Sequence, residues 1–185
     1  MDRAILEWVN GWPDWMGPAM RFFSEATQYL WFKIALGLLV IGLILVGGKA
    51  RQAAIFALLG FLLANELCDL LKNFIPLARP CQDFPLIDVN GIGCSDNPGT
   101  ASAHSANMAA AAFSFTYFLG WWGGPWIIVA FATGLSRIYV AAHYPSQVVF
   151  GWLVGAFSAF LLIATYRAYL ANRSRRTQVE DVAEA

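Results

Sequence analysis

Five long apolar stretches restrict the folds that are open to this chain. They cover roughly residues 31–48, 53–72, 104–122, 125–142 and 146–168. About 20 apolar residues are enough to cross a bilayer as an α-helix, and a helix satisfies all of its own backbone groups in lipid. The composition agrees, because only 13% of the residues are charged, against about 25% in a soluble domain. We therefore predict an all-α integral membrane protein, a bundle of about five transmembrane helices.

The first 30 residues do not continue this pattern. Residues 4–24 contain three charged side chains and are interrupted by Pro13 and Pro18. Their Trp, Phe and Met residues are typical of an amphipathic helix that lies in the membrane interface. A soluble N-terminal arm is the alternative. The start also lacks the basic and apolar regions of a signal peptide, so we expect no cleavage there.

Basic residues near the apolar stretches predict the orientation in the membrane. Lys49 and Arg51 separate the first two stretches, and four arginines follow the last one: Arg167, Arg173, Arg175 and Arg176. Both groups fall on the same side of a five-span protein, and such residues favour the cytoplasmic side. We expect a multi-pass protein of a bacterial-type inner (plasma) membrane, with residues 73–103 and 137–145 on the extracytoplasmic (periplasmic) face.

One membrane domain accounts for the whole length. We expect an interfacial amphipathic segment over residues 1–30, a transmembrane domain over 31–170 and a cytoplasmic tail over 171–185. The tail is polar, so we expect it to be disordered from about residue 172. The net charge is zero and basic residues form no continuous stripe, so nucleic acid is not expected as a partner. Nothing in the sequence indicates an oligomeric state.

Three short polar clusters interrupt the apolar pattern: Lys72–Pro80, Ala101–His104 and Ser136–Gln147. They place one Lys, two Arg and two His at the edges of apolar stretches, all on the predicted extracytoplasmic face. Charged groups cost about 2.5–3.5 kcal/mol each at the bilayer centre, so they are usually functional. Three fixed cations suit a phosphate dianion, and two histidines suit nucleophilic and acid chemistry on it.

The first cluster permits two interpretations. Glu66, Asp69 and Lys72 share one face of a predicted helix, and Arg79 follows in a loop. Lys72 and Arg79 can bind the same phosphate group. Lys72 would contribute a compact ammonium charge, and Arg79 a planar guanidinium that donates two parallel hydrogen bonds. An ion pair between Lys72 and Asp69 is the alternative.

The second cluster opens the third apolar stretch. Ser102 is a good N-cap for the helix that follows. A helix N-terminus presents free N–H groups and the positive end of a dipole, so Ser102 and the backbone of Ala103 and His104 can hold phosphate oxygens. A histidine that merely caps the helix is the alternative.

The third cluster joins the last two apolar stretches. Arg137 ends one predicted helix, His143 precedes the next, and Pro145 suits its first turn. Gln147 lies near the third position of that helix, from which its side chain can reach back towards the cap and His143. An interfacial Arg and His without catalytic function are the alternative.

Two cysteines, Cys81 and Cys94, fall in the predicted extracytoplasmic loop, where disulfides can persist. A bond between them would contribute roughly 3 kcal/mol of stability in the chain-entropy model. Two free thiols are the alternative. Metal binding is not expected, because no His or Cys lies nearby in ligand spacing. Cys68 is expected to be an ordinary packing residue.

Together, in this order and spacing, the three clusters resemble the motifs of the type-2 phosphatidate phosphatase superfamily. The matching residues are Lys72, Arg79-Pro80, Ser102-Ala103-His104, Ser136-Arg137 and His143. The resemblance covers about residues 53–165 and implies a helical bundle with its site at one membrane face. It departs from the usual pattern at Ala101 and Ala103, which replace Pro and Gly. Gln147 replaces the more frequent Asp, as in the glucose-6-phosphatase branch.

The resemblance also implies a role for each residue. His143 is then the nucleophile that forms a phosphohistidine, His104 the general acid, and Gln147 the residue that orients His143. The implied phosphate cradle comprises Lys72, Arg79, Ser102, Arg137 and the backbone near Ala103, with Glu66 and Asp69 supporting Lys72. No cofactor and no metal are implied.

The predicted function is a metal-independent phosphatase for a membrane lipid. The candidate substrates are undecaprenyl pyrophosphate, phosphatidylglycerol phosphate, phosphatidate and a lipid A phosphate. A phosphatase for small sugar phosphates and a lipid phosphotransferase remain open. So does a transporter or non-catalytic lipid-binding protein that would work through Glu66 and Asp69.

Overall fold

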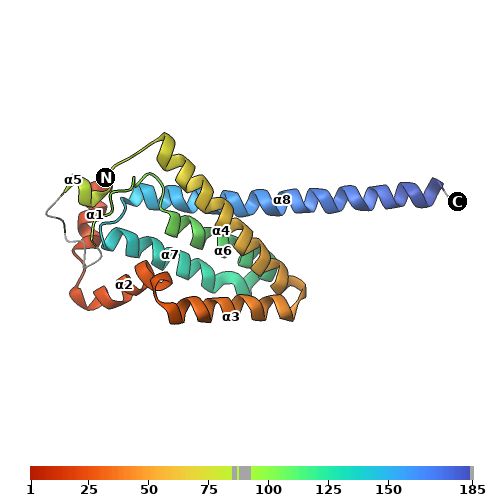
Figure 1. Cartoon of the computed structure of the whole chain (residues 1–185), viewed down its shortest axis with the longest axis horizontal. Coiled ribbons are helices and arrows are strands. Elements are labelled where there is room, and N and C mark those ends of the chain that lie inside the picture. The colour runs from red at the N-terminus through yellow and green to blue at the C-terminus, as the bar shows by residue number, and fades with distance from the viewer. Residues whose placement is uncertain (85–86, 88–92, 184–185) are drawn as a thin grey trace.

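The computed structural model describes residues 1–84, 87 and 93–183, and the regular structure in these residues is helical (Figure 1). The longer helices are α3 (Leu30–Val46), α4 (Gly48–Phe74), α6 (Ala103–Leu119), α7 (Gly124–Tyr139) and α8 (Pro145–Ala183). The shorter ones are α1 (Asp2–Asn10), α2 (Gly17–Glu25), α5 (Pro80–Asp83), η1 (Asp14–Met16), η2 (Ala26–Gln28) and η3 (Gly120–Gly123).

The all-α membrane fold is confirmed, with fewer clear spans than predicted. Three described stretches are long and apolar enough to cross a membrane: Gly48–Phe74, Ala103–Tyr139 and Pro145–Gln178. A fourth results if Asp14–Gln28 and Leu30–Val46, bent by 70°, count as one span. The Ala103–Tyr139 stretch contains both α6 and α7, which lie side by side and run in opposite directions (Figure 1). Each is shorter than the roughly 20 residues of a full span.

Helix α6 lies at the centre of the bundle and packs against α4, α7 and α8. The contact with α8 is close because small residues meet there. A Cβ atom on Gly155 of α8 would lie 1.9 Å from the Ala106 carbonyl oxygen, and one on Gly151 would lie 2.5 Å from that of Ser102. Small residues four apart let helix backbones approach in membrane proteins. This contact places the start of α8 beside the start of α6.

All three polar clusters lie at one end of the bundle. The end of α4, the start of α6, the end of α7 and the start of α8 meet there, next to α1 and α5 (Figure 1). The α3–α4 connection lies at the opposite end, and α8 extends past the bundle on that side (Figure 1). The predicted separation of the clusters from the basic residues is therefore present in the fold.

The C-terminal segment differs from the expected disordered tail. Helix α8 continues to Ala183, so the prediction of disorder from about residue 172 was wrong for the described residues. Residues 171–183 contain neither Gly nor Pro. Extending an existing helix costs far less than nucleating a new one, so the polar sequence continues the helix that the apolar part starts.

The N-terminal segment packs on the bundle as two short helices. Leu6 and Val9 of α1 are fully buried against a cluster that includes Tyr139, Val140 and Val148. This packing does not fit a free soluble arm. Whether the segment also lies in a membrane interface stays a prediction.

The close α6–α8 contact generates a stability prediction. Gly155→Ala should lower the free energy of unfolding by about 1–3 kcal/mol, because the new methyl group meets backbone that cannot move aside. Gly42→Ala in α3 is the matched control, since a Cβ there has no neighbour within 4 Å. Thermal unfolding in detergent measures both variants, and equal unfolding temperatures would contradict the packing argument.

Candidate functional site

The turn that follows α7 places His143. The carbonyl of Arg137 accepts hydrogen bonds from the N–H groups of Ala142 (3.0 Å) and His143 (3.2 Å), and Ala141 N–H donates to Ile138 (2.9 Å). Ala141 adopts φ 51°, in the left-handed region that usually takes glycine. These are the bonds of a Schellman helix end. The spacing of Arg137 and His143 is thus the spacing that this turn requires.

Hydrogen bonds fix the tautomer of His143. Its Nδ1 lies 3.0 Å from the Gly99 carbonyl oxygen and 3.2 Å from Gln147 Oε1. Gln147 Nε2 donates to Ala78 O at 2.8 Å, so Oε1 is the acceptor. Because both neighbours accept, Nδ1 carries the proton and Nε2 keeps its lone pair. That nitrogen lies 3.2 Å from Arg79 Nη1, which donates to it.

Gln147 connects the other parts of the site. It is the third residue of α8, and its Oε1 accepts the Tyr144 N–H at 3.1 Å, the reach back that the sequence predicted. Its backbone carbonyl accepts the Ser102 N–H at 3.1 Å. A Cβ on Gly99 would lie 2.7 Å from Oε1, so a side chain at this position would displace the Gln147 amide from its place beside His143.

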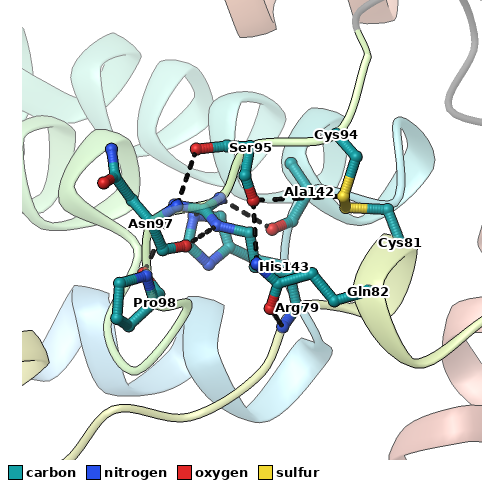
Figure 2. The surroundings of a disulfide bond; sticks show 9 residues. All are labelled: Arg79, Cys81, Gln82, Cys94, Ser95, Asn97, Pro98, Ala142 and His143. Carbon is teal, nitrogen blue, oxygen red and sulfur yellow. Dashed lines mark hydrogen bonds between the residues drawn. A yellow bond between two sulfur atoms is a disulfide. The ribbon is translucent and has the colours of Figure 1, made fainter.

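The Arg79 guanidinium is buried under two loops. It is 7% exposed. Its Nε donates to Asn97 O at 2.6 Å, Nη1 to Ala142 O at 2.9 Å and Nη2 to Pro98 O at 3.4 Å. Figure 2 shows these partners gathered around the guanidinium beside His143. Burial lowers the pKa of Arg79, but an arginine remains charged near neutral pH.

A disulfide joins Cys81 to Cys94 beside Arg79 (Figure 2). Of the two alternatives that the sequence left open, the structure contains the bond. Gln82 supports the same link, because its Nε2 donates to Ser95 O and its Oε1 accepts the Arg79 N–H, both at 2.9 Å. The bond therefore ties α5, which starts directly after Arg79, to the loop whose carbonyls hold the guanidinium.

The start of α6 carries the second cluster. Ser102 is fully buried, and its hydroxyl accepts hydrogen bonds from Ser105 N (3.4 Å) and Ser105 Oγ (2.9 Å). It is therefore the N-cap of α6, as the sequence predicted. The next two amides, of Ala103 and His104, belong to the first turn, where a helix has no acceptor of its own. Together they form the positive end of α6.

His104 lines a cavity of about 590 Å³. Most of the lining is apolar and includes Phe22, Phe32, Leu36, Phe61, Met108 and Trp126. The charges of Arg137, Arg79 and Lys72 all act on His104. His104 thus borders an apolar space and is subject to the positive field of the three cations.

Arg137 is 8% exposed and reaches the N-terminal segment. Its Nη1 donates to the Ser24 hydroxyl and, at 3.3 Å, to the Ser24 carbonyl. Its Nε is buried and has no hydrogen-bond partner in the described part of the chain. No sequence pattern indicated Ser24, which belongs to no motif and lies 113 residues away from Arg137.

Lys72 forms the ion pair with Asp69 that is the second interpretation of the first cluster. Its Nζ donates to Asp69 Oδ1 at 2.8 Å, so the ion pair foreseen from the helix spacing is present. Glu66 is exposed, one turn before Asp69 on α4.

Cys68 is free and buried, as expected. Within the described residues, no group of three or more His, Cys, Asp or Glu side chains is placed to bind a metal.

Burial and positive charge act together on His143. The side chain is 3% exposed. Burial holds the pKa of His143 well below its ordinary value, and the charges of Arg79 and Arg137 lower it further, whereas the hydrogen bonds that Nδ1–H donates to Gly99 O and Gln147 Oε1 raise it. The imidazole is therefore neutral at physiological pH, as its hydrogen bonds also require.

These features define a class: a multi-pass helical membrane protein with two histidines and three cations at one end of its bundle, an arrangement suited to phosphoryl transfer. The chain belongs to the PAP2 superfamily, whose family model matches residues 53–171. The resemblance to type-2 phosphatidate phosphatases that the motifs indicated is confirmed.

Several known proteins are similar to the chain. The bacitracin transport permease protein BcrC of Bacillus licheniformis is 29% identical over 150 residues, which are 81% of this chain and 71% of that protein. An undecaprenyl-diphosphatase of Sulfolobus acidocaldarius is 25% identical over 151 residues, 78% of this chain and 68% of that protein. The crystal structure of a PAP2-type phosphatidylglycerolphosphate phosphatase from Bacillus subtilis has a TM-score of 0.66 at 21% identity, covering 90% and 85% of the two chains. This last likeness shows the fold.

The buried neutral His143 predicts a pH dependence of stability. Its folded pKa lies below the unfolded value of about 6.5. The stability that it contributes is therefore present above pH 6.5 and is lost as the pH falls towards the folded pKa, by up to about 1.4 kcal/mol per pH unit. His143→Asn should lose less stability between pH 7.5 and 5. Thermal unfolding in detergent tests this, and parallel pH profiles for the two proteins would contradict it.

Removing the Gln147 side-chain amide should slow the hydrolysis of a phosphoric ester by the protein. Gln147→Leu keeps the size but deletes an acceptor for His143 Nδ1, so the imidazole loses a partner that sets its tautomer and orientation. Leaving a buried donor without one of its acceptors costs about 1–3 kcal/mol, which corresponds to roughly 5–150-fold in rate. We expect kcat to fall by that factor with a small change in KM. A variant with wild-type kcat would show that Gly99 alone orients His143.

Proposed function

We propose that the protein is a metal-independent membrane phosphatase that hydrolyses a lipid phosphate or pyrophosphate through a phosphohistidine at His143. The family and its relatives support a phosphoric ester hydrolase that acts on lipids. The single observation that carries the mechanism is the state of His143. Its Nδ1 donates to two acceptors, and its unprotonated Nε2 lies 3.2 Å from the Arg79 guanidinium.

In the proposed first step, the Nε2 lone pair of His143 attacks phosphorus. The N–P bond forms, the P–O bond to the lipid breaks, and His104 gives its proton to the leaving oxygen. Water then attacks the phosphohistidine, His104 takes a proton from that water, and the N–P bond breaks to release phosphate. The two arginines and the first amides of α6 stabilise the negative charge on the transferring phosphoryl group.

The cavity beside His104 supports a lipid as the leaving group. Its lining is mainly apolar, and a lipid alcohol that leaves next to His104 can place its first carbons there. A small sugar phosphate gains nothing from such a surface. Phosphatidylglycerol phosphate, phosphatidate and a lipid A phosphate would release a lipid alcohol, and undecaprenyl pyrophosphate would release a lipid monophosphate. All four are candidate substrates. A phosphotransferase would use the same first step, with a hydroxyl in place of water.

A transport function through Glu66 and Asp69 has less support. Asp69 is paired with Lys72 at 2.8 Å, and transport gives no reason for a histidine held in one tautomer. We therefore keep the phosphatase as the proposed activity.

We also propose that the site faces the extracytoplasmic side of a bacterial-type inner membrane. Lys49 and Arg51 belong to the first turn of α4, and this helix begins at the end of the bundle opposite the site (Figure 1). The arginines near the end of α8 lie towards the same end, and positive residues favour the cytoplasm. In this arrangement residues 1–30 are an interfacial segment, 31–170 the catalytic membrane domain and 171–185 a cytoplasmic tail.

Phosphate release from a panel of lipid phosphates tests the proposal, with a metal chelator present and His143→Ala alongside. We expect release by the wild type to be unaffected by chelator and to fall by at least about 10³-fold in His143→Ala, because the nucleophile is lost. Brief acid-free trapping with a ³²P-labelled lipid should label the wild type alone. Loss of activity with chelator, or full activity in His143→Ala, would refute the proposal.

A further inference from the structure

We infer that Ser24, on the N-terminal helix α2, is a positioning residue that holds the Arg137 guanidinium in its phosphate-binding orientation. The inference rests on the proposed phosphatase function. Ser24 lies outside residues 53–171, the part of the chain that the family model matches. The inference therefore assigns part of the active site to the N-terminal segment, which contains none of the three motifs.

The contacts of Arg137 carry the inference. One nitrogen, Nη1, donates both to the Ser24 hydroxyl and to the Ser24 carbonyl, at 3.3 Å for the latter. Ser24 itself is 1% exposed, so water does not compete for these bonds. Nη1 has two N–H groups, and both have an acceptor in Ser24. A single residue therefore anchors this corner of the guanidinium.

The opposite edge of the guanidinium is left for a ligand. The Arg137 Nε is buried and has no partner in the described part of the chain. In a planar guanidinium the Nε–H and one N–H of Nη2 point along the same edge, which matches two oxygens of a phosphate. A buried, charged donor without a partner is costly. An anion that accepts from this edge removes that cost.

The position of Arg137 in the structure agrees with a role in binding phosphate. Ser24 and His104 line the same cavity, and the charge of Arg137 acts on both His104 and His143. Arginine has many rotamers, so an unanchored guanidinium spends only part of its time in the binding orientation. Helix α2 packs against α7, and this packing makes Ser24 a fixed anchor.

Three serine variants test the inference. Ser24→Ala removes the hydroxyl acceptor, and Ser24→Thr keeps it. Ser158→Ala is the matched control, because Ser158 is also fully buried but donates only to Val154 O within α8, at 2.8 Å. Each variant is measured for kcat and KM on the lipid phosphate that the wild type turns over fastest, for binding of orthovanadate as a phosphate probe, and for its unfolding temperature.

We expect Ser24→Ala to lower kcat/KM by about tenfold and to weaken orthovanadate binding by a similar factor, as loss of one hydrogen bond to a charged group allows. The unfolding temperature should match that of Ser158→Ala. Ser24→Thr should stay within about threefold of the wild type. Wild-type kinetics and orthovanadate affinity in Ser24→Ala would overturn the inference. So would a kinetic loss that comes with a lower unfolding temperature and unchanged orthovanadate affinity.

The two proposals fail in different ways. If the wild type releases no phosphate from any lipid phosphate, the proposed function is refuted, while orthovanadate binding still reports on the Ser24–Arg137 contact. If the wild type is active and Ser24→Ala binds orthovanadate as tightly as the wild type does, only the role of Ser24 is refuted.

Discussion

The side chain of Gln147 is the point on which the three polar clusters depend. It donates to the Ala78 carbonyl of the first cluster, and its oxygen accepts from Tyr144 N–H and His143 Nδ1 in the third. Its backbone carbonyl accepts from Ser102 at the start of the second. One residue in the first turn of α8 thus fixes two loops and a helix terminus relative to the imidazole. A carboxylate here would accept from Nδ1 but would have no N–H for Ala78. This gives a structural reason for an amide at this position.

The partners of the two arginines preserve the positive charge of the site. The guanidinium of Arg79 is held by the carbonyls of Asn97, Pro98 and Ala142, and that of Arg137 by Ser24. These partners are neutral, so they hold each cation in place without cancelling its charge. Burial strengthens the electrostatic interactions of both charges, because solvent screening is weak there. Burial of the imidazole first, and then these two charges, lower the pKa of His143 and keep it neutral and therefore nucleophilic.

The N-terminal segment completes this end of the bundle. Besides Ser24, Asp2 of α1 accepts hydrogen bonds from the backbone (2.9 Å) and hydroxyl of Ser146, in the first turn of α8. Leu6 and Val9 bury their side chains against the turn that carries His143. The loops of the site are therefore held in place both by α1 and by the disulfide between Cys81 and Cys94.

The sequence by itself determined the membrane class, the all-α fold and the local contacts of Ser102 and Gln147. Apolar length, capping at Ser102 and the reach of Gln147 are short-range properties of neighbouring residues, so they can be read without a structure. Tertiary structure decided what joins distant segments: the Gly99 carbonyl on His143 and Ser24 on Arg137. Such contacts depend on how helices pack, and no local pattern encodes a hydrogen bond between residues 113 positions apart. The helical continuation of α8 was missed because polarity alone does not end a helix that is already formed.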